Sequence, residues 1–402
     1  MLFQRTFHAV GQGAFYSEEI SDKPGGRLFR MVYDCGSSTF SNKDMQKKAT
    51  SDLGADTEVD LLIVSHFDRD HINGIPALNP KRVMIPFLSR DICIYLMAQA
   101  YIADGEFDID MALHPERVFP EAQIIRVLPA PRENTLSEED RLRRREVRLL
   151  ETLDINSGLT PRASVVDIDS GAVISVTPGS SERPLWEYIP YNPNMEEFAE
   201  KFKAAIIGKQ LAWDSLQYGQ YFMKHFAEIK KIYNALGNKN RHSLVVYSGP
   251  LRQVESLHFG QCMNRPWVRD RILEYLHWLR PDLYVREFDN ASIMYFGDAT
   301  ISTSADWLLK FYDKLGKFRL VSVAFIQIPH HGSYSSHGEL IVKRRPFDHC
   351  FRGCLCIISH GINNSYRHPS STLISSLINE GSLVTTVTEN PASMLSTSFH
   401  IL

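Results

Sequence analysis

Short apolar runs recur along most of the chain, and their length predicts strands rather than long helices. Residues 61–64 (LLIV) are continuously apolar, which is typical of a strand buried on both faces. The first fifty residues contain two further strand-like segments. The strands come in groups with helices between them, so we expect two sheets with helices on the outside. Later runs predict strands at 163–168, 172–179, 243–249, 292–298, 320–329, 354–359, 383–389 and 396–402.

The middle of the chain follows a different rhythm. Within residues 183–237 the apolar positions recur at intervals of four and three residues, as in the stripe of an amphipathic helix: Phe222, Phe226, Ile229, Tyr233 and Leu236. Gly237 is a suitable residue to end such a helix. We therefore interpret 183–237 as a helical insertion in a chain that is otherwise built on strands.

Composition narrows the class of protein. The chain has 402 residues, of which 44% are apolar and 23% charged, as in an ordinary soluble globular protein. No apolar run approaches the length of a membrane span, and the first residues lack the features of a signal peptide. The six cysteines form no Cys-x-x-Cys pair and are too few for a disulfide framework in a chain of this length. We expect a cytoplasmic protein without a membrane segment.

The charge of the chain does not indicate a nucleic-acid binder. Its formal net charge is −3, and its basic runs are short: 141–148 (RLRRREVR) and 343–345 (KRR). In the first run acidic residues precede basic ones at helical spacing, so a solvated helix with internal ion pairs is the simpler interpretation. Aromatic segments in the insertion (WEYIPYNPN and QYGQYF) could bind a nucleic-acid strand or could only pack the insertion.

The densest chemistry directly follows the apolar run 61–64. Residues 65–75 read SHFDRDHINGI and place four ligand-type side chains within six positions: His66, Asp68, Asp70 and His71. A buried strand is a rigid platform for such a loop, and imidazole with carboxylate suits Zn, Mn or Fe. The alternative is a polar turn with a capping aspartate. Four ligand types so close together favour a metal site, and two adjacent pairs can hold two ions.

Ligand-type residues also follow the later apolar runs. Asp298, His330, His331 and His360 come at or directly after the ends of such runs, and His368 lies eight residues beyond His360. Each of them could by itself be a turn, cap or hydrogen-bonded residue. Because strand ends at one edge of a sheet converge in space, their repeated placement predicts one shared site.

These stretches together resemble the metallo-β-lactamase fold superfamily, and more narrowly the hydrolase domain of the ComEC family of competence proteins. The resemblance implies an α/β fold, a four-layer αβ/βα sandwich that forms a single domain over residues 1–402. Intervals that do not match imply insertions at about 183–237, 85–155 and 250–285. The matching stretches occur in the family's order: AVGQGAFY (9–16), MVYDCGSS (31–38), VSHFDRDHINGI (64–75), HSLVVY (242–247), MYFGDAT (294–300), IPHHGSYSS (328–336) and ISHGINNSYRHPSS (358–371).

The resemblance also implies a ligand set. His66 and Asp68 would bind one ion, Asp70 and His71 a second, and Asp298 would bridge them. His330 is the expected additional ligand. Further candidates at the ions or beside them are His331, His242, His360 and Asp34.

Two positions refine this set. Most members of the superfamily have a histidine where this chain has Asp68, and the aspartate makes the site harder, which favours Mn relative to Zn. The stretch VTPGSS carries serine where many members have a histidine, and His242 could substitute for it. Asp34 would orient the histidines as a hydrogen-bond acceptor behind the ligands.

The expected chemistry is hydrolysis with two divalent metal ions, Zn or Mn. Such ions lower the pKa of a water molecule, which Asp70 could position, while His368 could stabilise the developing negative charge. We favour a phosphodiesterase or nuclease acting on nucleic acid, with DNA as the substrate, because the ComEC-type domain is thought to act on DNA.

Two alternatives stay open. A hydrolase of small esters, lactones, thioesters or phosphoesters would use the same site, and a narrow pocket capped by 183–237 would favour it. A module with weak or lost catalysis could instead dock a protein partner through its insertions, in a multi-protein defence or competence system.

Overall fold

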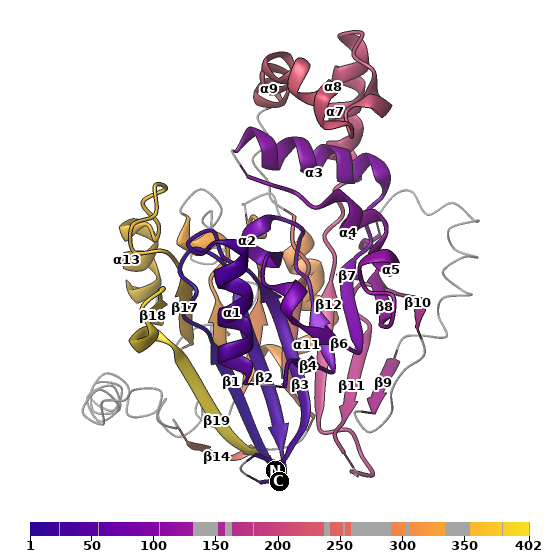
Figure 1. Ribbon diagram of the computed structural model, residues 1–402. Coiled ribbons are helices and arrows are strands. Elements are labelled where there is room, and N and C mark those ends of the chain that lie inside the picture. The colour runs from indigo at the N-terminus through magenta and orange to yellow at the C-terminus, as the bar shows by residue number, and fades with distance from the viewer. Residues whose placement is uncertain are drawn as a thin grey trace.

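A computed structural model shows how these segments are arranged (Figure 1). The basic runs 141–148 and 343–345, and most of the expected insertion at 250–285, lie outside the residues that the structure describes. These are residues 1–23, 25–54, 56–103, 105–131, 152–156, 163–179, 181–236, 242–251, 254–258, 291–301, 306–333, 354–379 and 381–401.

The first large sheet is parallel along one half and antiparallel along the other. Its last strand pairs with its first, and the amino group of Met1 donates a 2.7 Å hydrogen bond to the Ile401 carbonyl. The order of its strands, as far as they are described, is β10 (Ser164–Ile168), β8 (Gln123–Val127), β7 (Arg82–Pro86), β5 (Leu61–Ile63), β3 (Arg27–Cys35), β2 (Phe15–Ser21), β1 (Leu2–Phe7), β19 (Leu395–Ile401) and β14 (Val254–His258).

The second large sheet is parallel from β18 (Leu383–Val387) to β15 (Ser292–Tyr295) and mostly antiparallel beyond. Its described strands follow the order β18 (Leu383–Val387), β17 (Leu355–Ser359), β16 (Val323–Gln327), β15 (Ser292–Tyr295), β13 (Val245–Pro250), β12 (Trp186–Tyr191), β11 (Val173–Thr177) and β9 (Thr152–Asn156). A separate short pair consists of β4 (Glu58–Val59) and β6 (Asn79–Pro80).

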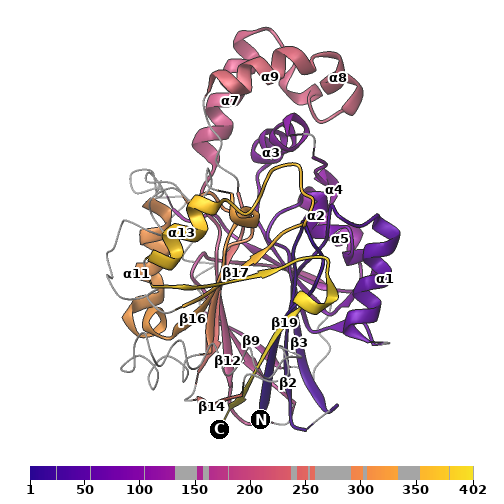
Figure 2. The same ribbon diagram turned by 90° about the vertical axis from the view of Figure 1, so that its left-hand side faces the viewer.

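The two sheets pack face to face, and helices cover their outer faces (Figure 2). Within β5, Leu61 and Ile63 belong to the core between the sheets, whereas Leu62 belongs to the core under the outer helices. All three are fully buried, which confirms the prediction of a strand buried on both faces. The four-layer αβ/βα sandwich that the resemblance implied is therefore the fold of this chain.

Each sheet has its own set of outer helices. Beside the first sheet lie α1 (Asn42–Leu53), α4 (Ile109–Leu113) and α5 (Pro115–Val118), whereas α3 (Arg90–Ile102) lies over the edge of the sandwich. Beside the second lie α11 (Asp306–Val321) and α13 (Ser371–Asn379). The first residues of the strand predicted at 320–329 instead complete α11. Short 3-10 turns occur at η1 (Ile75–Ala77), η3 (Trp213–Ser215), η4 (His330–Gly332) and η5 (Pro391–Ser393).

The interpretation of 183–237 as a helical insertion is wrong at its start, because these residues include β12, an internal strand of the second sheet. The rest forms a further helical layer that packs on α3 and consists of α7 (Glu196–Gly208), α8 (Gly219–Lys224) and α9 (Phe226–Ala235). Most of the predicted apolar stripe faces inward, since Phe222, Ile229 and Tyr233 are buried, whereas Leu236 at its end is 37% exposed. It is carried by two helices rather than one, because the helical conformation is interrupted at His225. Both views show this layer rising from the edge of the sandwich that also carries α2 (Arg69–Ile72).

That edge is where the strands place the chemistry. Residues at or just beyond the ends of β3, β5, β15, β16 and β17 are Asp34, His66, Asp298, His330 and His360. Strands of the two sheets thus end at one rim, as expected for a site at the carboxyl ends of strands.

No helix in the described part of the chain combines the length and the apolar character needed to cross a bilayer.

Candidate metal centre

The loop after β5 carries the dense cluster and leads into α2. Asp68 is the N-cap residue of α2 and has an extended backbone, whereas Asp70 and His71 lie within the helical turn. Two glycines allow this turn to pack closely on the preceding loops. A Cβ on Gly36 would lie 2.5–2.6 Å from backbone atoms of Asp70 and His71, and one on Gly13 would lie 2.8 Å from the Asp70 carbonyl oxygen. The glycines therefore fix where the cluster sits.

Asp34 orients the histidines of this loop. Its Oδ1 accepts a 2.7 Å hydrogen bond from the Ser65 N–H, and its Oδ2 accepts from the Ser65 hydroxyl at 2.6 Å and from His71 Nδ1 at 2.8 Å. Because the Ser65 proton goes to Asp34, the Ser65 oxygen accepts the Nδ1–H of His66, which lies 2.9 Å away. Asp34 thus orients His71 directly and His66 through Ser65, and in both rings Nε2 carries the lone pair.

Asp298 enters the same site from the second sheet. The preceding Gly297 has a φ of +54°, and a Cβ there would lie 2.8 Å from Ser65 Oγ and 2.9 Å from Ser243 Oγ. The Ser243 hydroxyl accepts the Asp298 N–H at 2.8 Å and lies 3.2 Å from His66 Nδ1. A glycine is needed at 297 because the two halves of the site meet at this point.

The histidine pair after β16 completes the arrangement. His330 and His331 both have left-handed backbone conformations, with φ of +48° and +54°. The Nδ1 of His331 lies 2.9 Å from the carbonyl oxygen of Ser359. A carbonyl oxygen only accepts, so this nitrogen carries the proton and Nε2 of the neutral ring carries the lone pair.

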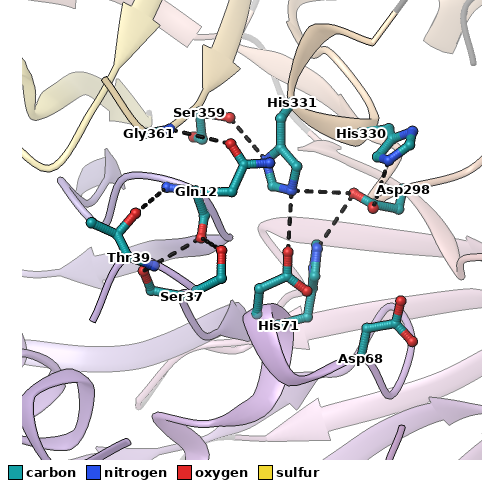
Figure 3. Close-up of polar contacts among 12 residues, drawn as sticks. Gln12, Ser37, Thr39, Asp68, His71, Asp298, His330, His331, Ser359 and Gly361 are labelled. Atoms are coloured by element: carbon teal, nitrogen blue, oxygen red, sulfur yellow. Dashed lines mark hydrogen bonds and ion pairs between the residues drawn. The ribbon is translucent and has the colours of Figure 1, made fainter. Parts of the chain in front are cut away.

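The side chains converge around Asp298 (Figure 3). Its Oδ1 lies 3.4 Å from His71 Nε2 and 3.9 Å from His331 Nε2, and its Oδ2 lies 3.9 Å from His330 Nε2. His331 Nε2 also lies 3.4 Å from Oδ2 of Asp70. Residues more than 220 positions apart in the chain thus meet at one point.

The other predicted pair lies next to this group. His66 Nε2 is 3.8 Å from Oδ2 of Asp68, and the rings of His66 and His71 are 3.9 Å apart between centroids. The Asp68 side chain is 20% exposed and the Asp70 side chain 24%, whereas that of Asp298 is 3% exposed. The two carboxylates of α2 and its N-cap therefore border solvent, and Asp298 closes the site from within.

A divalent cation fits this set of donors. Asp70, His71 and His331 each offer a ligand atom within 4.8 Å of the other two. The buried Nε2 atoms of His71 and His331 make no hydrogen bond to any residue that the structure describes. Neutral rings turn lone pairs toward carboxylate oxygens, which is unfavourable unless a proton or a cation lies between them. Asp34, His66 and His71 form a second group of this kind, but the oxygens of Asp34 already accept three hydrogen bonds.

The charges in the site respond to one another strongly. Burial alone would lower the pKa of His71, but the carboxylates of Asp298 and Asp34 raise it well above its usual value. Burial would raise the pKa of Asp298, but the positive charges of His330, His71 and His331 hold it well below its usual range. The buried Asp298 carboxylate is thus favoured in its ionised form and requires positive charge beside it.

The remaining candidate histidines occupy different places. The rings of His368 and His330 are 5.6 Å apart between centroids, so His368 borders the cluster. His360 Nδ1 instead lies 3.0 Å from the carbonyl oxygen of Gly361, and no contact with the cluster is found in the described ranges. The ring of His242 is also turned elsewhere, since its Nε2 lies 2.7 Å from Oδ1 of Asn192. The structure does not bring His242 or His360 to the cluster.

Sequence reasoning missed Ser243 and Gln327. Ser243 is the neighbour of His242, and its hydroxyl, not the imidazole, reaches His66 and Asp298. Gln327 Oε1 accepts the backbone N–H groups of Phe296 and Gly297 and so shapes the turn before Asp298. The only sequence signal for either was its position at a strand end next to a motif residue.

Comparisons with known proteins give limited guidance. The sequence matches no family model, and no curated protein matches it. Among solved structures, the chain is similar to a long form RNase Z from yeast, with 8% sequence identity and a TM-score of 0.33. The match covers 90% of this chain but only 37% of that one, so this chain spans little more than a third of its length.

Proposed function

We propose that the chain is a metal-dependent hydrolase of the metallo-β-lactamase superfamily, and that its substrate is a phosphodiester within a nucleic acid. The observation that carries the proposal is the arrangement at Asp298. The carboxylates of Asp298 and Asp70 face the Nε2 atoms of His71 and His331. The Nδ1 atoms of the two rings point away from them, to Asp34 and to the Ser359 carbonyl oxygen. Such a donor set is what a Zn or Mn ion requires.

The proposal assigns a role to each side chain. Asp70, His71, His331 and Asp298 would hold one ion; His331 replaces His330 in this role because its Nε2 also lies near Asp70. His66 and Asp68, together with Asp298, would hold a second ion, and either Zn or Mn suits both positions. Asp34 would fix the orientation of the His71 ring, and Ser243 that of the His66 ring.

The chain's own residues also direct the reaction. Bound cations would supply an ionised water and neutralise charge on the phosphoryl oxygens. Asp70 borders solvent, so its carboxylate would accept a hydrogen bond from the attacking water and orient it. His368, next to His330 at the rim, would donate a hydrogen bond to the oxygen on which negative charge develops.

The test compares two partly buried carboxylates, Asp70 and Asp52. Purified protein would be incubated with Mn or Zn and with labelled single-stranded and double-stranded DNA and RNA. We expect the wild type to cleave nucleic acid and the Asp70→Asn variant to lose that activity. Asp52→Asn is the matched control, because Asp52 bonds His8 and Lys48 away from the site and should remain active when replaced.

Three outcomes would contradict the proposal in different ways. Turnover of a generic phosphodiester or carboxylic ester without cleavage of any nucleic acid would point to a small-molecule hydrolase. Equal loss of activity in Asp70→Asn and Asp52→Asn would show that Asp70 is not part of the site. Metal analysis that found no bound ion after loading would favour a module that only docks a partner.

A further inference from the structure

The loop that follows β17 projects an aromatic side chain beside the candidate metal centre. Tyr366 is 58% exposed, and its ring stacks on that of His368 at 5.8 Å between centroids and 13° between planes. His368 in turn packs edge to face against His330, which faces Asp298. A continuous series of rings thus leads from the protein surface to the cluster, and His368 is the ring that joins Tyr366 to His330.

This loop is held in shape by its own hydrogen bonds. The Asn364 side chain donates to the carbonyl oxygens of Gly361 at 2.7 Å and His368 at 2.6 Å, and its Oδ1 accepts the His368 N–H at 2.8 Å. The Gly361 N–H donates to Gln12 Oε1 at 3.3 Å, which ties the loop to the first sheet. The exposed ring therefore sits on a fixed support.

An aromatic ring left at the surface forgoes the free energy that burial of its apolar face would contribute. A core role does not explain Tyr366, since one face rests on His368 and most of the residue faces solvent. Arg367, the next residue, is also exposed, has a φ of +58° and makes no ion pair in the described part of the chain. A flat apolar face beside a guanidinium group is suited to a ligand that carries a planar ring and an anionic group.

We propose that Tyr366 and His368 form a stacking platform for one base of a single-stranded nucleic acid, with Arg367 binding a flanking phosphate. The inference rests on the proposed function and deepens it, because it places a base next to the diester to be cleaved. Stacking tolerates any base, so the platform would position the strand without reading its sequence. A duplex would have to expose a base before it could bind in this way.

Binding of a fluorescent single-stranded oligonucleotide, measured by anisotropy without added metal, tests the platform. Replacement of Tyr366 by alanine should weaken binding about tenfold, within the range found for loss of one base stack. Tyr366→Phe keeps the ring and should bind like the wild type. Ile362→Ala is the matched control, because Ile362 is 57% exposed in the same loop but has no ring.

An oligonucleotide with abasic positions separates stacking from general contact. The wild type should bind it about tenfold more weakly than the intact strand, and Tyr366→Ala should show no further loss. Arg367→Ala should weaken both strands equally and reduce the slope of affinity against salt concentration by less than one charge. Equal weakening of both strands by Tyr366→Ala, or no weakening of either, would overturn the platform.

Hydrolysis separates this inference from the proposed function. If the wild type binds the strand through Tyr366 but cleaves no diester with any metal, the proposed function fails and the platform stands. If the wild type cleaves a diester that has no aromatic ring and Tyr366→Ala binds nucleic acid normally, the proposed function stands and the platform fails.

Discussion

Two clusters of charged side chains inside this sandwich differ in how their polar atoms are paired. In the first, between the sheets, the fully buried Glu18 carboxylate is surrounded by donors. Its Oε1 accepts from Arg5 Nε at 2.7 Å and from the Tyr295 hydroxyl at 3.0 Å, and its Oε2 accepts from the Tyr188 and Ser248 hydroxyls at 2.9 and 2.7 Å. The charge of Glu18 is thus paired with that of Arg5, and both of its carboxylate oxygens accept hydrogen bonds.

The second cluster, at the rim, is not balanced in this way. The carboxylates of Asp298 and Asp70 face imidazole Nε2 atoms at 3.4–3.9 Å, while the Nδ1 atoms of His71 and His331 are directed to other acceptors. The contrast teaches that burial alone does not mark a functional site. A functional site is marked instead by buried lone pairs that face one another, here those of the carboxylates and of imidazole rings whose N–H groups point to other acceptors. Only an added cation or proton can pair with such a set of lone pairs.

The same substitution in each cluster should have opposite consequences, and the largest effect is expected at the rim. Asp298→Asn removes the carboxylate shared by the proposed ions, so we expect metal binding to be lost and hydrolysis to fall about a thousandfold or more. The folded state without metal should be retained, since asparagine keeps the size of the side chain and an oxygen that can accept hydrogen bonds. Metal analysis, initial rates and thermal unfolding with and without a chelator measure the three effects. If the Asp298→Asn variant kept its metal, the assignment of Asp298 as a metal ligand would be wrong.

Glu18→Gln should destabilise the fold and leave the site intact. The amide no longer neutralises the guanidinium of Arg5, which is fully buried, and breaking such a pair costs about 3–5 kcal/mol. Denaturant unfolding gives the change in the free energy of unfolding, and metal titration of the folded protein should give the wild-type affinity. A large drop in metal affinity with unchanged stability would reverse the contrast between the clusters.

His242 offers a third case, a buried histidine beside the site that is expected to act on stability alone. Burial lowers its pKa to about 4 from 6.5. Below pH 6.5 the unfolded chain takes up a proton that the folded chain refuses, so stability is lost as the pH falls, by on the order of 3 kcal/mol near pH 4. His242→Gln should remove this contribution.

Urea unfolding of both proteins at pH 7 and at about pH 4.5 isolates the effect of His242, since other titrating groups are common to the two chains. The loss of stability between these pH values should be larger in the wild type. An equal loss in both proteins would show that His242 does not titrate as a buried neutral ring.

The sequence predicted the architecture better than it predicted the contacts within the site. The run 61–64 and the later apolar runs identify strands because the local pattern of apolar residues shows whether a strand is buried on one face or on both. The broken helix at His225 was not predicted, since the apolar stripe continues through the break. The choice between His242 and Ser243 could not be made either, because it depends on which side chain faces across the sheets, and the contact of Ser243 with His66 spans 177 residues.

Ser243→Ala should have the smallest effect and gives the sharpest view of how the rim is organised. Its hydroxyl contacts both His66 Nδ1 and the Asp298 N–H, so it joins the ligand loops of the two sheets without binding an ion itself. Loss of such a supporting contact lowers metal affinity by about tenfold, with a stability loss of about 1 kcal/mol. Ser292→Ala is the matched control: Ser292 is equally buried, but its hydroxyl contacts Tyr247 and Ser322. A similar stability loss in both variants, with weaker metal binding only in Ser243→Ala, would show that the two sheets are coupled through this hydroxyl. Equal metal affinities would mean that each sheet positions its ligands independently.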